Sequence, residues 1–160
     1  MTEPVVKAGS GVVVIKDDKY VLVGQRQGSH GDGLWSFPGG HIDPTDTSFR
    51  QQGSREVREE TGIDCLVISP DGLRDDLFTT FDILSEDGTK RYVTVYLLAR
   101  YLGGGEAVDG NPLRIKPLED KCKEWHWKTL DELVAMIRDE KAKAWIPILQ
   151  VNHYLRPLIG

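Results

Sequence analysis

The sequence predicts a single α+β domain in which helices cover a mixed β-sheet. Two observations support this prediction. Runs of β-branched and aromatic residues alternate with turn sequences over most of the chain, and two segments carry the start signals of helices. A length of 160 residues is typical of one domain with its own core, so we expect residues 1–160 to form one unit.

The first strands are expected at residues 9–15 and 20–24, joined as a hairpin by the polar turn between them. Residues 28–33 are a loop by composition, because glycine and polar residues dominate them. A short strand over residues 34–37 then ends at Pro38.

The first helix is expected to begin at a cap provided by Asp46 or Thr47 and to end at about Thr61. Gly62 then supplies the left-handed residue that commonly follows a helix. Gly53 lies inside this helix, where glycine costs roughly 1 kcal/mol relative to alanine. Close packing of the helix on the sheet would compensate for that cost.

Further strands are expected in the second half of the chain, at residues 63–69, 76–84, 91–101 and 124–127. Residues 103–117 read as a long loop, and loops of that length are often functional. Trp125 and Trp127 alternate with His126, which places both indoles on one face of the sheet, in the core.

Two helices are expected near the C-terminus. Thr129 and Glu132 have the spacing of a capping box, so a helix should open there and run to about Asp139. A final helix over residues 144–155 would be interrupted at Pro147.

Composition and charge exclude several classes of function. The net charge is −5 and no run of Lys and Arg exceeds two residues, which argues against a nucleic-acid polymer as partner. Cys65 and Cys122 form neither a disulfide framework nor a zinc-binding pattern, and we expect two buried, reduced thiols. No apolar run approaches the length of a membrane span, and the N-terminus lacks signal-peptide features. We therefore expect a cytoplasmic protein with no membrane partner.

Three glutamates at the end of the first helix are the strongest functional signal. Glu56 and Glu60 are one helical turn apart and share a face, with Glu59 next to them. Like charges at this spacing cost a few tenths of a kcal/mol per pair. A hard divalent cation removes the repulsion, because Mg²⁺ takes oxygen ligands and bridges to substrate phosphates.

These residues resemble the Nudix box, whose second half is matched without exception by Arg55, Glu56, Val57, Glu59, Glu60, Gly62 and Ile63. The first half departs from the family pattern. Asp46 stands where the family has glutamate when counted from Gly40, and one extra residue separates it from Arg55. Counted backward from Arg55, Thr47 takes that place. We interpret Asp46 as a partial substitute for the missing glutamate.

The resemblance extends beyond the box, to segments similar to the nucleoside triphosphate branch of the family at residues 24–29, 34–42, 92–94 and 121–127. It implies an α/β/α sandwich around a mixed sheet, and a hydrolase that cleaves a nucleoside triphosphate to monophosphate and pyrophosphate. Mg²⁺ is the implied cofactor, with Mn²⁺ able to take its place. The intact Glu59–Glu60 pair favours attack of water at phosphorus rather than at a sugar carbon.

The resemblance also implies roles for individual residues. Glu56, Glu60 and Glu59, with the carbonyl of Gly39, are the expected metal ligands. Glu59, Glu56 and Arg55 are the expected catalytic group, and the sequence does not decide which carboxylate acts as base. Arg55 precedes Glu59 by four residues and can pair with its carboxylate.

The expected substrate-binding residues are Arg26, Trp35, Gly40 and Asp120. Arg26 either reaches a phosphate or is an ordinary surface arginine. Trp35 either stacks on a base or packs in the core, which is commoner. Asp120, with Glu119, either brings a late-loop carboxylate to the metal or is an exposed acidic loop.

Two alternatives to the triphosphate hydrolase stay open. One is a Nudix hydrolase of nucleotide sugars or dinucleotides, and the other is a non-catalytic Nudix module that binds a nucleotide or a protein. The oligomeric state is open as well, and a homodimer is considered only because dimers are the commonest oligomers.

Overall fold

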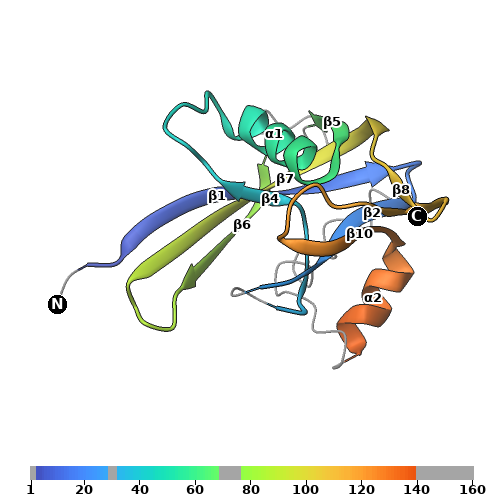
Figure 1. Cartoon of the computed structure of the whole chain (residues 1–160). Coiled ribbons are helices and arrows are strands. Elements are labelled where there is room, and N and C mark those ends of the chain that lie inside the picture. The colour runs from blue at the N-terminus through green and yellow to red at the C-terminus, as the bar shows by residue number, and fades with distance from the viewer. Residues whose placement is uncertain (1–2, 29–31, 69–76, 140–160) are drawn as a thin grey trace.

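The computed structural model describes residues 3–28, 32–68 and 77–139. Two helices lie on opposite faces of a curved sheet, α1 (Phe49–Thr61) on one and α2 (Leu130–Arg138) on the other (Figure 1). The expected α/β/α sandwich is confirmed for this part of the chain. The final helix expected over residues 144–155 lies outside it. Within the described residues, no helix is long and apolar enough to cross a lipid bilayer.

The sheet is mixed, as expected. Its main path runs β5-β7-β1-β2-β10-β9-β8, while β3 pairs with β2, β4 with β1 and β6 with β7. The described strands are β1 (Val5–Lys16), β2 (Tyr20–Arg26), β3 (Trp35–Ser36), β4 (Gly39–His41), β5 (Ile63–Ile68), β6 (Leu77–Leu84), β7 (Lys90–Gly104), β8 (Ala107–Val108), β9 (Asn111–Ile115) and β10 (Cys122–Thr129). Among them β1 and β7 form the parallel pair, in register from Val5↔Lys90 to Ile15↔Arg100.

The core has two halves, one on each face of the sheet. Alternate residues of β1 separate them: Val12 and Val14 face the α1 side, whereas Val13 and Ile15 face the α2 side. Trp125 and Trp127 both lie in the α1-side half and are 2% exposed, which confirms the core placement expected from their spacing.

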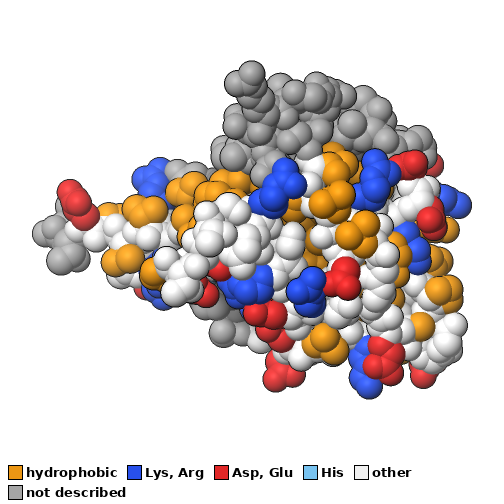
Figure 2. All heavy atoms as spheres, turned by 90° about the horizontal axis from the view of Figure 1, so that it is seen from above, with side chains coloured by type: hydrophobic (Ala, Val, Ile, Leu, Met, Phe, Trp, Pro, Cys, Tyr) orange, Lys and Arg blue, Asp and Glu red, His pale blue; other side chains and the backbone are white. Residues whose placement is uncertain are grey.

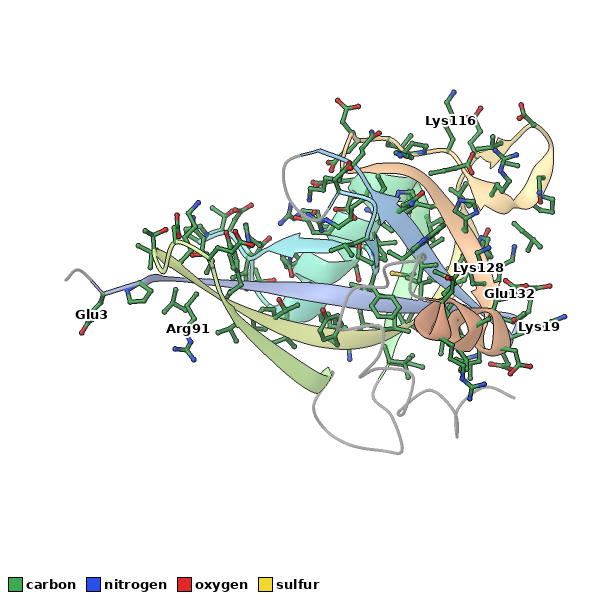
Figure 3. The ribbon with its side chains drawn as sticks, turned by 90° about the horizontal axis from the view of Figure 1, so that it is seen from below. Glu3, Lys19, Arg91, Lys116, Lys128 and Glu132 are labelled. Atoms are coloured by element: carbon green, nitrogen blue, oxygen red, sulfur yellow. The ribbon has the colours of Figure 1, made fainter. Side chains whose placement is uncertain are left out.

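The sheet extends beyond both helices as an arm made of β1, β6 and β7. Glu3 and Arg91 lie at the end of this arm, far from Lys128 and Glu132 near α2 (Figure 3). β1 starts at Val5, earlier than the expected residue 9, because β7 supplies a parallel partner along its whole length.

The expectation of a long loop over residues 103–117 is wrong. β7 continues to Gly104, and β8 and β9 form a hairpin within this segment. Asp109 and Gly110 turn it with positive φ angles of 51° and 73°. An Asp-Gly pair is a strong signal for a two-residue hairpin turn, and it is present in the sequence.

The first helix is capped by Ser48, not by Asp46 or Thr47. The Ser48 side chain accepts a hydrogen bond from the backbone N–H of Gln51 at 3.1 Å. Gly62 ends the helix in the left-handed conformation, as expected. A Cβ on Gly53 would lie 2.7 Å from the Leu97 Cδ1 methyl, so this glycine does allow close packing of α1 on the sheet.

Candidate active site

One face of α1 is polar yet buried, and it lies against β4. Gln52, Glu56 and Glu60 succeed one another at four-residue spacing and are all buried. The cap at Ser48 fixes where the helix starts, and the contact of α1 with β4 fixes which face turns inward. The two glutamates expected to share a face do so.

Gln52 fastens this face to the sheet. Its side-chain amide donates to the carbonyl of Gly40 at 2.8 Å and to that of His41 at 3.3 Å. Its amide oxygen accepts a hydrogen bond from the Ser10 hydroxyl. Because Gln52 itself is fully buried, its amide depends on these three partners, and the hydrogen bonds hold α1 against β4.

Two glycines allow the backbone of β4 to approach its neighbours closely. A Cβ on Gly39 would lie 1.9 Å from the carbonyl oxygen of Ser10, and one on Gly40 would lie 2.7 Å from the carboxyl carbon of Glu56. The N–H of Gly39 donates to Glu60 Oε2 at 3.1 Å. Gly40, expected to contact substrate, therefore leaves the space that the Glu56 carboxylate fills.

A lysine from a distant part of the sequence completes this group. The Nζ of Lys121 lies 2.9 Å from Glu60 Oε1 and 3.9 Å from Glu56 Oε2. It also donates to the carbonyl oxygen of Gly39 at 3.5 Å. One cationic nitrogen is thus surrounded by three oxygens, all from residues that the sequence predicted as metal ligands.

Burial dominates the electrostatics of the two carboxylates. It raises the pKa of Glu60 to about 7, although Lys121 and the Gly39 N–H oppose the shift. The pKa of Glu56 is also raised by burial, with Lys121 and Arg55 opposing. Burial lowers the pKa of Lys121, but Glu60 and Glu56 outweigh this, and the net shift is upward.

Arg55 organises a second carboxylate group on the exposed edge of α1. Its guanidinium lies 3.3 Å from both oxygens of Glu59, which confirms the pairing expected from their spacing. The other terminal nitrogen donates to Asp46 Oδ2 at 3.0 Å, and the Asp46 side chain is only 4% exposed. Arg55 Nη1 is also 3.7 Å from Glu56 Oε1, so it links the two groups.

Glu59 stands apart from the buried pair, because its carboxylate turns toward Arg55 and is 45% exposed. Within the part of the chain that the structure describes, no cluster of three or more His, Cys, Asp or Glu side chains is placed to hold a metal ion. The oxygens that do converge are therefore two carboxylates and one backbone carbonyl.

The expected substrate residues lie in different places. Arg26 pairs across the sheet with Cys122, next to Lys121. Trp35 packs against the α2-side core and meets the His126 ring edge-on at 5.2 Å between centroids, on the opposite face from the glutamates. Asp120 is exposed, and its carbonyl accepts a hydrogen bond from Gln27 at 2.9 Å.

Two residues of the site were missed by sequence reasoning. Gln52 continues the Glu56–Glu60 spacing by one turn, so helical periodicity could have identified it. Lys121 carries no local signal, because only the pairing of β10 with β2 brings it to the glutamates.

The face of the molecule that carries α1 shows basic and acidic side chains interspersed (Figure 2).

A glutamate-lined helix held against a Gly-Gly strand on a mixed sheet agrees with the family expected from the box. A family model described as the NUDIX domain matches residues 6–149. The chain belongs to the Nudix family. As a Nudix hydrolase it is an enzyme that cleaves phosphoanhydride bonds.

Named relatives and solved structures agree with this assignment. This Nudix hydrolase is 28% identical over 150 residues to the RNA pyrophosphohydrolase of Erythrobacter litoralis (strain HTCC2594), a match that covers 88% of this chain and 87% of that protein. It is 46% identical over 55 residues to the CTP pyrophosphohydrolase of Escherichia coli (strain K12), covering 34% of this chain and 40% of that protein.

The fold also resembles the crystal structure of a NUDIX hydrolase from Alicyclobacillus acidocaldarius. The TM-score is 0.71 and the identity is 16%, over 96% of this chain and 92% of that one. At this identity the likeness concerns the fold, and it supports the α/β/α arrangement described above.

Proposed function

We propose that this Nudix hydrolase cleaves a nucleoside triphosphate to a nucleoside monophosphate and pyrophosphate, at a divalent cation held by Glu56, Glu60 and the Gly39 carbonyl. The observation that carries the proposal is the convergence of these three groups on one cationic nitrogen, that of Lys121. The name of the CTP pyrophosphohydrolase relative supports a triphosphate substrate.

The oxygens present fit a hard cation. Two carboxylates and a carbonyl are ligands that Mg²⁺ accepts, and Mn²⁺ accepts the same set. Mg²⁺ commonly binds to one or two carboxylates and completes its coordination with water and substrate phosphates. The lack of a third converging carboxylate in the described residues is therefore compatible with a cation shared with substrate.

The cation would neutralise phosphate charge and make a bound water a better nucleophile. The chain's own residues supply the rest. Glu59 accepts the proton of the attacking water at its exposed carboxylate, and Arg55 holds that carboxylate in place. Glu56 lies between Arg55 and Lys121, so its carboxylate is held from both sides.

Substrate contacts are proposed beside this group. Arg26 pairs across the sheet with Cys122, the residue after Lys121, and this neighbourhood supports a contact between its guanidinium and a substrate phosphate. Asp120 adjoins Lys121 in the chain, and Gly40 borders the Glu56 carboxylate. Trp35 packs against the core on the other face of the sheet, so we do not assign it to the phosphates.

The test is a substrate panel incubated with and without Mg²⁺, with products separated by chromatography. The panel holds the nucleoside triphosphates, nucleotide sugars, dinucleotides and a short RNA with a 5′-triphosphate. We expect pyrophosphate from a nucleoside triphosphate, abolished by chelator and reduced about 100-fold or more by Glu60→Gln. Glu106→Gln, an exposed glutamate paired with Lys116, is the matched control and should leave the rate unchanged.

Other outcomes select the alternatives. Turnover of only a nucleotide sugar, a dinucleotide or the RNA would refute the nucleoside triphosphate as substrate, and the proposed metal site would still stand. Nucleotide binding without turnover of any member would reject the enzyme and leave a binding module.

A further inference from the structure

The ammonium of Lys121 lies where the proposed divalent cation would lie. It contacts Glu60 Oε1, Glu56 Oε2 and the carbonyl of Gly39, the three groups proposed as ligands. A single position cannot hold both an ammonium and a divalent ion in contact with the same oxygens, because the two charges repel and their volumes overlap.

The two partners of this ion pair differ in their access to water. The Glu60 side chain is 3% exposed, whereas the Lys121 side chain is 47% exposed. A buried carboxylate needs a compensating cation, and removing that cation is costly. Lys121 therefore supplies a charge that Glu60 needs, through a side chain that has room to leave.

The backbone around Lys121 is fixed, so only its side chain has to move. Gln27 donates its backbone N–H to the Lys121 carbonyl at 2.9 Å and its side-chain amide to the Asp120 carbonyl at 2.9 Å. The next residue, Cys122, is buried and pairs with Arg26. The flexible four-carbon stem of lysine can swing outward from this anchored position.

We propose that Lys121 is an internal counter-cation that competes with the divalent metal for Glu56, Glu60 and the Gly39 carbonyl, so that metal binding expels its ammonium from the site. The inference rests on the metal site proposed above. It predicts that Lys121 stabilises the metal-free protein and weakens metal binding.

The experiment measures Mn²⁺ binding to the full chain without nucleotide, by calorimetry and by the Mn²⁺ electron paramagnetic resonance signal. Lys121→Met should bind Mn²⁺ about tenfold or more tightly than the wild type, because the competing charge is gone. Lys121→Arg should bind no more tightly than the wild type, because it keeps the charge. Lys123→Met is the matched control, since this exposed lysine lies two residues away and changes the net charge equally.

Thermal unfolding in chelator provides the second measurement. Lys121→Met should melt below the wild type without metal, and this deficit should shrink as Mn²⁺ is added. If Lys121→Met does not fold, Lys121→Gln serves instead, because it leaves Glu60 a hydrogen-bond donor without the charge.

The outcomes separate this inference from the proposed function. Wild-type binding that Glu60→Gln abolishes, with equal or weaker binding by folded Lys121→Met, overturns the competition and leaves the metal site standing. Binding gained by Lys121→Met alone supports the competition. No binding by either protein overturns both.

Discussion

Counted from Gly40, Asp46 stands at the position where the Nudix box has a glutamate, and its contacts show what this carboxylate does. Its side chain is nearly buried and accepts hydrogen bonds from Arg55 at 3.0 Å and from the backbone N–H of Asp43 at 2.7 Å. Arg55 in turn holds Glu59. The departure from the family pattern therefore keeps a carboxylate behind Arg55, and the inserted residue precedes a helix that starts after Ser48.

Replacing Asp46 tests this role. Asp46→Ala removes one of the carboxylates that pair with Arg55 and the acceptor of the Asp43 N–H, so we expect a loss of about 1–3 kcal/mol in unfolding free energy. A lower kcat should accompany it, because Arg55 is then held less firmly and no longer orients the Glu59 carboxylate as well. Urea unfolding and steady-state kinetics provide the measurements.

Asp43→Ala is the control for this substitution. Asp43 also faces Arg55, at 3.6 Å, but its side chain is 62% exposed, so its loss should cost less than about 0.5 kcal/mol. Equal costs for the two variants would refute the role given to Asp46.

Glu60 makes the stability of the metal-free protein depend on pH. Its folded-state pKa of about 7 lies above the ordinary value of 4.5, so the folded protein holds the proton more tightly than the unfolded chain. The contribution of Glu60 to the free energy of unfolding therefore falls as the pH rises from about 4.5 to about 7, and it no longer changes at higher pH.

Comparison with Glu60→Gln isolates this effect. In chelator, the unfolding free energy of the wild type should decrease relative to that of the variant between pH 5 and pH 8, by about 1–3 kcal/mol. Urea unfolding at several pH values measures the difference. A difference that is constant with pH would mean that Glu60 has its ordinary pKa in the folded protein.

At the scale of elements, the site depends on how α1 lies against β4. Gly39 belongs to β4 and Glu60 to α1, and Gln52 joins the two elements through the Gly40 and His41 carbonyls. Without these bonds the helix could shift relative to the strand. The positions of the three proposed metal ligands therefore depend on Gln52, whose hydrogen bonds go to the carbonyls of the two residues that follow Gly39.

Gln52→Met removes this attachment while nearly conserving volume. We expect a loss of about 1–3 kcal/mol in unfolding free energy, because the buried Ser10 hydroxyl and the part-buried carbonyls of Gly40 and His41 lose their partner. Metal affinity should fall with it. Gln51→Met, on the exposed side of the same helix, should cost less than about 0.5 kcal/mol, and similar costs for both would contradict the attachment.

Elements with strong local signals could be predicted from the sequence, and contacts between distant elements could not. Spacing within a single helix predicts the shared face of Glu56 and Glu60 and the end of α1 at Gly62. It also predicts the cap of α2 at Thr129. The β8–β9 hairpin was missed although its Asp-Gly turn is visible, because three consecutive glycines before it suggest a loop. Lys121 depends on the pairing of β10 with β2, which no local pattern encodes.

At the scale of the whole molecule, a bound cation should act on global stability. A ligand that binds only the folded state adds about 2.7 kcal/mol at a concentration 100 times its Kd. We expect Mg²⁺ to raise the unfolding free energy of the wild type by this amount, as measured by urea unfolding. The double variant Glu56→Gln, Glu60→Gln should show no gain, and an equal gain would place the cation elsewhere.

The parallel pairing of β1 with β7 has a consequence for how the chain reaches this fold. β1 lies at the centre of the sheet, yet its longest partner is made only after β2 to β6 and α1. During synthesis, the central strand therefore emerges long before the neighbour that completes it. Because pairing of distant segments is slow, the assembly of β1 with β7 should limit the folding rate. Until β7 is available, the valines of β1 have no complete core, and this interval is when the nascent protein is most exposed to aggregation.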